Sequence, residues 1–265
     1  MDLSKEKIER KLQDMCIKEL NGLSKYKLIY MDDDSFDLRP TDTGRLMARY
    51  YLAFETMKSF STLTGNENLP ELLALVSSCK EFEDIQLRVN EKKILNDLNK
   101  SKTTSIRFPL PGKIKTRAMK INCLIQATFG CLPITEPTFN QDIAKIFRSG
   151  IRVTQCLAEY LRFDTKGFSV LYNAIVLGKC FKARLWENSK HVSRQLDKIG
   201  VTLSTVFVNA GITSFESLAN TNPRELELIL NRNPPFGSIL VDSVKHLPQY
   251  EIEAEQVSRF LCSVI

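Results

Sequence analysis

Residues that could do chemistry gather on one face of a single segment near the middle of the chain. Four polar residues recur there at steps of three and four positions: Lys145, Arg148, Arg152 and Gln155. A helix would present all four side chains on one face, where they could contact successive phosphates or bases of a single nucleic-acid strand. The small residues Ser149 and Gly150 would let that strand approach the helix backbone. An ordinary amphipathic helix with a solvated face has the same spacing, and periodicity alone favours this simpler interpretation.

A second group of positive charges lies in residues 98–135, a stretch without any acidic residue. Its cations are Lys100, Lys102, Arg107, Lys113, Lys115, Arg117 and Lys120. Clustered cations favour a polyanionic partner, because binding releases counterions from a phosphate backbone. The run Phe108-Pro109-Leu110-Pro111-Gly112 cannot be helical throughout, so we expect a loop. We take Lys113, Lys115 and Arg117 as candidate nucleic-acid contacts, and a basic loop that is merely solvated is an equal alternative.

A third candidate contact lies near the carboxyl end of the chain. Pro234-Pro235-Phe236-Gly237 is typical of a tight turn, and a helix is predicted to begin at Ser238. Free amides at a helix N-terminus can bind a phosphate, which makes Gly237 and Ser238 candidates for backbone contacts. A turn that serves only packing fits the same residues equally well.

The sequence contains no pattern for catalysis, a cofactor or a metal. The two Gly-Lys pairs, Gly112-Lys113 and Gly178-Lys179, lack the upstream glycine and the following hydroxyl residue of a nucleotide-binding phosphate loop. His191 and His246 have no second ligand or nucleophile at a telling spacing. The 7 cysteines include no C-x-x-C pair, which favours reduced thiols over zinc. We therefore predict that this chain by itself is not an enzyme and holds no cofactor or metal.

Helical elements are expected to position these residues. The 265 residues are 43% hydrophobic with a net charge of +6, and no apolar run reaches the roughly 18 residues of a membrane span. Periodicity near 3.6 predicts helices over residues 5–20, 44–63, 69–78, 90–98, 115–129, 139–163, 168–186, 203–210, 215–220, 223–231 and 238–246. Residues 26–30 and 36–38 predict a β-hairpin, and alternating residues after Pro248 predict one further strand.

These elements predict an all-α fold with four parts. Residues 1–39, a helix followed by one hairpin, resemble the C-terminal part of a winged-helix domain. Residues 40–192 form a helical bundle, and residues 193–248, with their pairs of short helices, form a small helix-hairpin-helix-like domain. Residues 249–265 are interpreted as the truncated start of a β domain, because a lone strand cannot form a sheet.

Three stretches of the chain are similar to a known family. They are Thr41-Asp42-Thr43-Gly44-Arg45 with Tyr50-Tyr51 and Phe54-Glu55-Thr56-Met57 downstream, Leu72–Ser78 followed by Glu81-Phe82 and Leu87–Glu91, and Gly178–Trp186. Together they resemble the Sec-sixty-three homology domain of large superfamily-two helicases, over residues 40–250. Lys92–Asn96 and Ile106–Pro109 most resemble the meiosis-specific crossover DNA helicases, with the spliceosomal RNA helicase as the nearest competitor.

The resemblance implies a function for the central segment. In this family the long bundle helix is a ratchet that lines the exit channel of the translocating strand, which assigns Arg148, Arg152 and Gln155 to strand contact. The chain would then be a nuclear accessory module that grips and guides single-stranded or branched DNA in meiotic recombination. Its partners would include helicase motor domains, normally in the same chain, and possible further proteins, but no membrane. The alternative is a protein-interaction module without nucleic-acid grip, as in a translocation factor or spliceosomal docking units.

Overall fold

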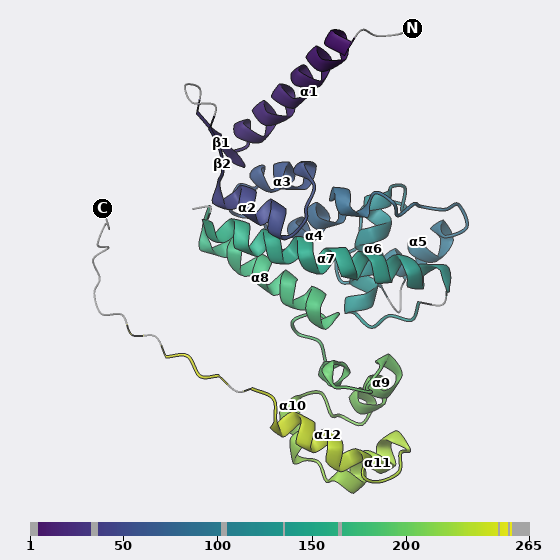
Figure 1. Cartoon of the computed structure of the whole chain (residues 1–265). Helices are drawn as coiled ribbons and strands as arrows, with labels where there is room; N and C mark the ends of the chain where they lie inside the picture. The colour runs from purple at the N-terminus through teal and green to yellow at the C-terminus, as the bar shows by residue number, and fades with distance from the viewer. Residues whose placement is uncertain are drawn as a thin grey trace. The chain divides into compact units, whose positions relative to one another are not determined.

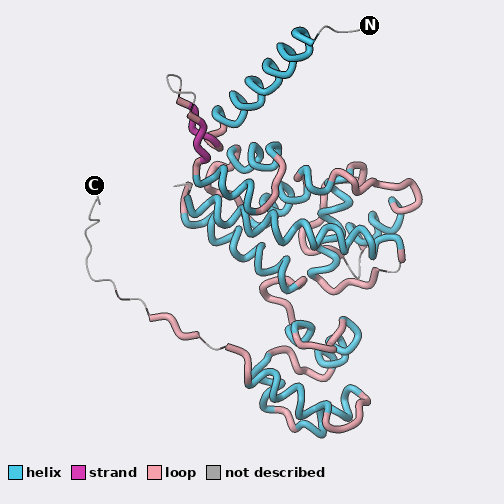
Figure 2. The backbone as a smooth tube through the Cα atoms, in the orientation of Figure 1, coloured by secondary structure: helices cyan, strands magenta, loops and turns pink. Residues whose placement is uncertain are grey.

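The fold is all-α, as predicted, and its helices fall into two compact units. The computed structural model describes residues 5–32, 37–101, 105–134, 136–163, 166–248, 250–253 and 255. The large unit is Met1–Ser189 and the small unit is Lys190–Ile265. Within the described residues, strands occur only as one two-stranded antiparallel sheet, drawn in magenta in Figure 2.

The large unit begins with a helix and a hairpin and continues as a bundle (Figure 1). Its elements are α1 (Lys5–Lys25), β1 (Ile29–Met31), β2 (Leu38–Pro40), α2 (Asp42–Arg49), α3 (Phe54–Ser61), α4 (Leu69–Ser77), the 3-10 helix η1 (Lys80–Phe82), α5 (Lys92–Lys100), α6 (Arg117–Phe129), α7 (Thr138–Phe163) and α8 (Phe168–Ala183). The predicted hairpin is present, with Ile29 opposite Pro40. Its second described strand begins at Leu38. Residues 33–36, which include most of the predicted turn and Phe36 of the predicted strand, lie outside the described residues.

The Thr41–Gly44 motif joins this hairpin to the bundle. The Thr41 side chain caps α2 by accepting a hydrogen bond from the Gly44 amide at 3.0 Å, and its hydroxyl lies 2.7 Å from the Lys27 carbonyl oxygen. A Cβ atom at Gly44 would stand 1.8 Å from the Leu28 carbonyl oxygen. Only glycine therefore lets α2 pack this closely on the chain that enters the hairpin.

The single helix predicted over residues 44–63 is wrong, because the chain breaks between α2 and α3. Tyr51 adopts a positive φ of 50°, which ends α2 without any glycine or proline. Across the break, the Glu81 carboxylate accepts hydrogen bonds from the Ala53 amide at 2.8 Å and the Thr56 hydroxyl at 2.6 Å. A residue 28 positions away thus satisfies the start of α3, so local periodicity gave no sign of the break.

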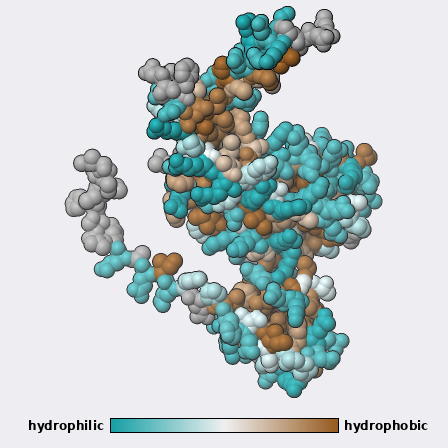
Figure 3. All heavy atoms as spheres, in the orientation of Figure 1, coloured by the Kyte–Doolittle hydropathy of each residue, from teal (hydrophilic) through white to brown (hydrophobic). Residues whose placement is uncertain are grey.

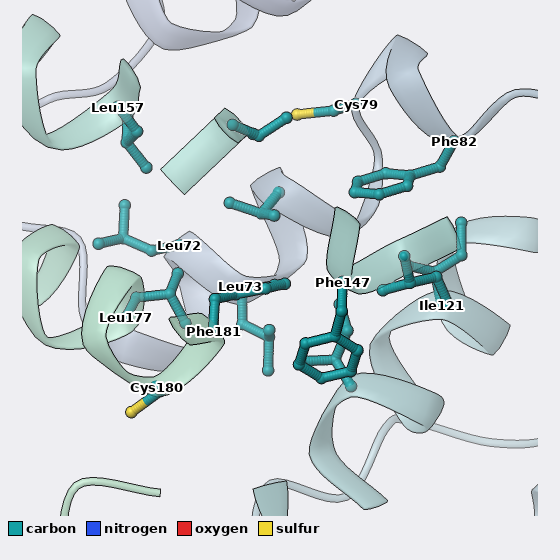
Figure 4. Packing of buried hydrophobic residues seen from close by; sticks show 14 of the residues in the cluster. Leu72, Leu73, Cys79, Phe82, Ile121, Phe147, Leu157, Leu177, Cys180 and Phe181 are labelled. Carbon is teal, nitrogen blue, oxygen red and sulfur yellow. The ribbon is translucent and has the colours of Figure 1, made fainter. Parts of the chain in front are cut away.

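The core of the large unit lies among α4, α6, α7 and α8. Figure 4 shows Phe147 and Phe181 close together within the cluster that also holds Leu72 and Leu73. The α7–α8 contact depends on Gly150, since a Cβ atom there would lie 2.3 Å from the Phe181 ring. Gly150 is buried, so its small size serves this packing. The expectation that Gly150 lets a nucleic-acid strand approach the helix backbone is therefore wrong.

One charged group lies inside this core. Lys120 is 0% exposed, and its ammonium lies 2.7 Å from the carboxylates of both Glu91 and Asp142 and donates to the Gln86 carbonyl oxygen. Burial alone raises the pKa of Glu91, but hydrogen bonds from Lys120 and Arg88 outweigh it and hold that pKa below its ordinary value. The interpretation of Lys120 as part of a basic surface is therefore wrong.

The small unit contains η2 (Val192–Gln195), α9 (Val201–Asn209), α10 (Phe215–Asn220), α11 (Pro223–Leu230) and α12 (Phe236–Lys245). Gly211 follows α9 with a φ of 82°, the left-handed position that favours glycine after a helix. Asn222 caps α11 by accepting a hydrogen bond from the Arg224 amide. The strand predicted after Pro248 is absent from residues 250–253 and 255, which have no neighbouring strand to pair with.

Candidate nucleic-acid interface

The polar face of α7 faces solvent. The four residues predicted on it differ in exposure and in hydrogen-bond or ion-pair partners. Arg148 and Gln155 are exposed, and neither forms a hydrogen bond or ion pair within the part of the chain that the structure describes. Lys145 is exposed but pairs with Asp84 at 2.7 Å. Arg152 is half-buried and donates to the Tyr50 carbonyl oxygen at 3.3 Å, with no acidic partner among the described residues. The two arginines therefore keep their positive charge available to a ligand.

The opposite face of α7 fixes this orientation. Ile146, Val153 and Leu157 are each 0% exposed, and they lie across the helix from the arginines. At the carboxyl end, Tyr50 and Arg49 of α2 both donate to the Glu159 carboxylate. Burial and that carboxylate raise the pKa of Tyr50 to about 12, so the phenol stays protonated and keeps donating. The polar face is thus bounded by the junction with α2.

A turn after η1 brings the basic segment next to α7. The Arg117 guanidinium donates to the Glu83 carbonyl oxygen at 3.1 Å, while Lys145 pairs with the neighbouring Asp84. Lys80 in η1 pairs with the Glu83 carboxylate at 2.7 Å. Arg117 and Lys145, which lie 28 positions apart in the sequence, are therefore anchored on consecutive residues of one turn.

The loop before α6 is held in place and points its lysines outward. Side-chain amides of Asn99 and Gln126 bond the backbone of Leu110 and Phe108 in both directions. Ile114 is 1% exposed, and it lies between Lys113 and Lys115, which are both exposed. Because a buried residue separates them, both ammonium groups face solvent on a loop whose backbone is fixed.

Not every cation of the acid-free segment is available to a ligand. Arg107 pairs with Glu187 at 2.7 Å and lies over the rings of Phe108 and Trp186. Lys120 is buried, as described above. Lys102 lies outside the described residues. The sequence therefore overestimated the positive charge that residues 98–135 expose to solvent. The acidic residues that pair with Arg107 and Lys120 lie outside this stretch.

The structure places Gly237 inside the small unit. It is buried, its amide donates to the Glu227 carboxylate at 3.0 Å, and a Cβ atom there would meet the Pro223 carbonyl oxygen at 2.0 Å. The expectation that this amide is free for a phosphate is therefore corrected, since an internal acid already occupies it. Ser238, the next residue, is exposed.

No catalytic arrangement is visible among the described residues. Burial raises the pKa of Cys123, Cys156 and Cys180 to about 12, which keeps these thiols protonated and poorly nucleophilic. His191 lies 3.3 Å from the Ser204 hydroxyl, but Ser204 is 0% exposed, so no substrate reaches it. The described residues contain no group of three metal-ligating side chains and no helix long and apolar enough to cross a bilayer.

Sequence reasoning missed the residues that surround Arg152. A cavity of about 400 Å³ is lined by Tyr51, Leu52, Ala53, Lys80, Glu81 and Arg152. Tyr51 is 84% exposed and stands at the break that periodicity did not indicate. The one available signal was the repeated aromatic pair Tyr50-Tyr51 in a stretch without helix breakers.

Comparison with known proteins identifies the fold that carries this face. The family model of the Sec63 Brl domain matches residues 40–263. The chain belongs to the Sec63 Brl domain family. The resemblance inferred from the motifs is thereby confirmed, and α7 is the long bundle helix of this Sec63 Brl domain.

Several relatives of this chain are named as helicases. The chain is 54% identical over 259 residues to the probable ATP-dependent DNA helicase HFM1 of Xenopus tropicalis, covering 97% of the chain and 19% of that protein. It is 35% identical over 264 residues to the ATP-dependent DNA helicase homolog MER3 of Arabidopsis thaliana, covering 96% and 23%. Identity to the U5 small nuclear ribonucleoprotein 200 kDa helicase of Drosophila melanogaster is 28% over 245 residues, covering 89% and 10%. The chain thus spans about a fifth of the length of the DNA helicases it matches.

Proposed function

We propose that this Sec63 Brl domain grips and guides single-stranded or branched DNA within an ATP-dependent DNA helicase. The observation that carries the proposal is the pair of cations on α7, Arg148 and Arg152, which face outward without an acidic partner among the described residues. Their spacing of four residues sets them one helical turn apart. A single strand running along α7 could therefore place successive phosphates on the two guanidinium groups.

The surroundings of the two arginines support a strand path. Lys113, Lys115 and Arg117 add positive charge beyond Lys145, and Gln155 offers an amide at the other end of the face. Contacts of this kind go mainly to phosphates, so they position a strand without reading its sequence. That property suits a translocating motor, which must accept every sequence.

The relatives favour DNA and a role in meiotic recombination. Identity is higher to the DNA helicases of Xenopus tropicalis and Arabidopsis thaliana, at 54% and 35%, than to the small nuclear ribonucleoprotein helicase, at 28%, and the sequence motifs most resemble the meiosis-specific crossover branch. On this proposal the protein acts in the nucleus, and motor domains of the full-length helicase hydrolyse ATP. The domain itself binds and guides the DNA strand.

The test removes both arginines of the α7 face. Arg148→Ala with Arg152→Ala should weaken binding of a fluorescent single-stranded oligonucleotide, measured by anisotropy at several salt concentrations. The slope of log affinity against log salt should fall by roughly 0.7 for each lost phosphate contact, or about 1.4 for the pair. The loss should be the same for different sequences, because phosphate contacts carry little base information.

A matched control removes two cations from another helix. Lys179→Ala with Lys182→Ala deletes the same charge from exposed positions of α8 and should leave affinity and salt slope near the unmodified values. Circular dichroism checks that both double variants remain folded. If the α7 variant is folded and binds with unchanged affinity and salt slope, the strand path along α7 is refuted.

One observation favours the alternative, a protein-interaction module. Phe168, Tyr172 and Ile175 of α8 are 78%, 56% and 42% exposed, and their spacing puts them on one helix face. Exposed apolar groups of this kind mark protein contacts. The same binding experiment decides between the two, since a module of this type would bind no single-stranded DNA.

A further inference from the structure

Tyr51 combines a rarely adopted backbone conformation with an exposed aromatic ring. Its φ is 50°, in the left-handed region that residues with a Cβ atom seldom occupy. Its side chain is 84% exposed, so no packing against the core compensates for this conformation. Backbone strain that core packing does not explain is a mark of functional sites.

The hydrogen bonds around Tyr51 show why the position calls for glycine. The Tyr51 amide donates to the Ala48 carbonyl oxygen at 3.2 Å, and the Leu52 amide donates to the Met47 carbonyl oxygen at 3.0 Å. This is the Schellman motif, in which glycine usually takes the left-handed position after the helix. A tyrosine here presents its ring to solvent at the end of α2, at the expense of stability.

Two cations share a cavity with Tyr51. Tyr51, Lys80 and Arg152 line the same cavity of about 400 Å³, and Arg152 is held by its bond to the Tyr50 carbonyl oxygen. The one acid of this cavity, Glu81, already accepts from Ala53 and Thr56 with both carboxylate oxygens. The cavity therefore offers an aromatic ring and two cations, Arg152 and Lys80, of which Lys80 also forms a surface ion pair with Glu83 at 2.7 Å.

We propose that Tyr51 is a stacking platform for one base of the bound strand, with the flanking phosphates on Arg152 and Lys80. This inference rests on the proposed function, and it adds a base contact to what would otherwise be a purely phosphate-directed grip. Stacking tolerates every base, because each has a π face.

The first test changes the ring alone. Tyr51→Ala should weaken binding of a single-stranded oligonucleotide by about 5- to 100-fold, the loss expected for one stacked base, with an unchanged salt slope. Tyr51→Phe keeps the π face and should bind like the unmodified protein. Tyr172→Ala, which removes another exposed tyrosine of the same unit, is the control and should leave affinity unchanged.

A second test uses the base as the variable. Oligonucleotides whose bases are replaced by abasic sites at successive positions should bind the unmodified protein less tightly when the gap meets Tyr51. The Tyr51→Ala variant should lose that sensitivity to the gap, since it has no ring left to stack. Equal sensitivity in both proteins would contradict a base contact at Tyr51.

A third variant separates stability from binding. Tyr51→Gly suits the left-handed position, so it should raise the thermal midpoint while it lowers affinity as much as Tyr51→Ala. Folded Tyr51 variants that bind with unchanged affinity would overturn the stacking proposal, although the Arg148 and Arg152 pair could still bind the strand. If instead the unmodified chain binds no single strand, both the proposed function and this inference fall.

Discussion

At the scale of single residues, the charge of a side chain does not show whether it can bind a ligand until its partners in the fold are known. Lys120 belongs to the most basic stretch of the sequence, yet it is buried between Glu91 and Asp142. Arg148 has no acidic partner among the described residues and keeps its charge exposed. The two residues share a charge and differ in function, because one neutralises buried acids and the other faces solvent.

Replacing the buried lysine should be costly. Lys120→Met leaves Glu91 and Asp142 buried without their shared cation, which should lower the free energy of unfolding by about 3 kcal/mol, since Arg88 still pairs with Glu91 at 2.7 Å. Lys145→Met breaks an ion pair of the same 2.7 Å length, but at the surface, and should cost less than about 1 kcal/mol. Urea unfolding of both variants at neutral pH measures the difference.

The same variant has a predicted pH dependence. The pKa of Glu91 is below its ordinary value, so this group stabilises the fold above the unfolded pKa of about 4.3 and loses that effect as pH falls through the folded pKa. Lowering the pH below about 4 should therefore destabilise the unmodified protein. The difference in free energy of unfolding between the unmodified protein and the Lys120→Met variant should then become smaller. A difference that stays constant from neutral to acid pH would contradict the assigned role of the triad.

At the scale of elements, glycine positions decide how closely helices pack. Gly150 of α7 faces Phe181 with no room for a Cβ atom, whereas a Cβ atom at Gly178 of α8 would have Thr154 as its nearest neighbour at 3.9 Å. The first position needs glycine for packing. At the second position, packing does not require glycine, and glycine only destabilises the helix through its greater backbone entropy in the unfolded chain.

Alanine at these two positions should have opposite effects. Gly150→Ala gains helix propensity but forces the Phe181 ring to move, and we expect a net loss of about 1–2 kcal/mol in stability. Gly178→Ala, at ordinary contact distance, should gain about 0.5–1 kcal/mol. Thermal unfolding of both variants measures whether each substitution raises or lowers stability. A stabilised Gly150→Ala variant would show that the α7–α8 contact is looser than described.

The break between α2 and α3 shows the limit of element prediction. Hydrophobic spacing from Gly44 to Leu63 is continuous, and the stop comes from Glu81, which satisfies the Ala53 amide from 28 positions away. Helix capping inside a residue's own segment is visible in a sequence, as at Thr41 and Asn222. A cap supplied by a distant carboxylate is not.

At the scale of the whole molecule, two separate hydrophobic cores indicate two folding units. Phe181 and Phe207, each 0% exposed, belong to different clusters of buried residues, one within the large unit and one within the small unit. Each unit therefore has its own source of stability. The proposed boundary between bundle and helix-hairpin-helix-like domain lies close to this division at residues 189 and 190.

Truncating each phenylalanine should affect one unit only. Phe207→Ala should cost about 3–5 kcal/mol and, because small domains are only marginally stable, should raise amide hydrogen exchange throughout α9 to α12 while α4 to α8 stay protected. Phe181→Ala should raise exchange in the large unit and spare the small one. Exchange that rises in both units after either substitution would mean that they unfold together.

The α1 helix carries an apolar face that the described residues leave uncovered. Ile8, Leu12 and Met15 are between 46% and 56% exposed, and Figure 3 shows brown, hydrophobic side chains along this helix. No residue of α1 is buried. That residues 1–39 are the C-terminal part of a winged-helix domain stays a prediction.

The sequence by itself determined the features that depend on local spacing. Periodicity predicted most of the helices, the all-α fold and the outward face of α7, because an apolar stripe must turn toward the core and leaves the opposite side to solvent. Short motifs predicted the family. These features need only residues a few positions apart.

Tertiary structure decided which of the predicted residues remain available to a ligand. Whether Lys120 and Gly237 face outward depends on acids that fold against them, Glu91 and Asp142 for the one and Glu227 for the other. The position of Tyr51 beside Arg152 depends in turn on a helix break that Glu81 supports from a distant segment. Contacts between distant segments have no local periodicity, so only the folded chain reveals them.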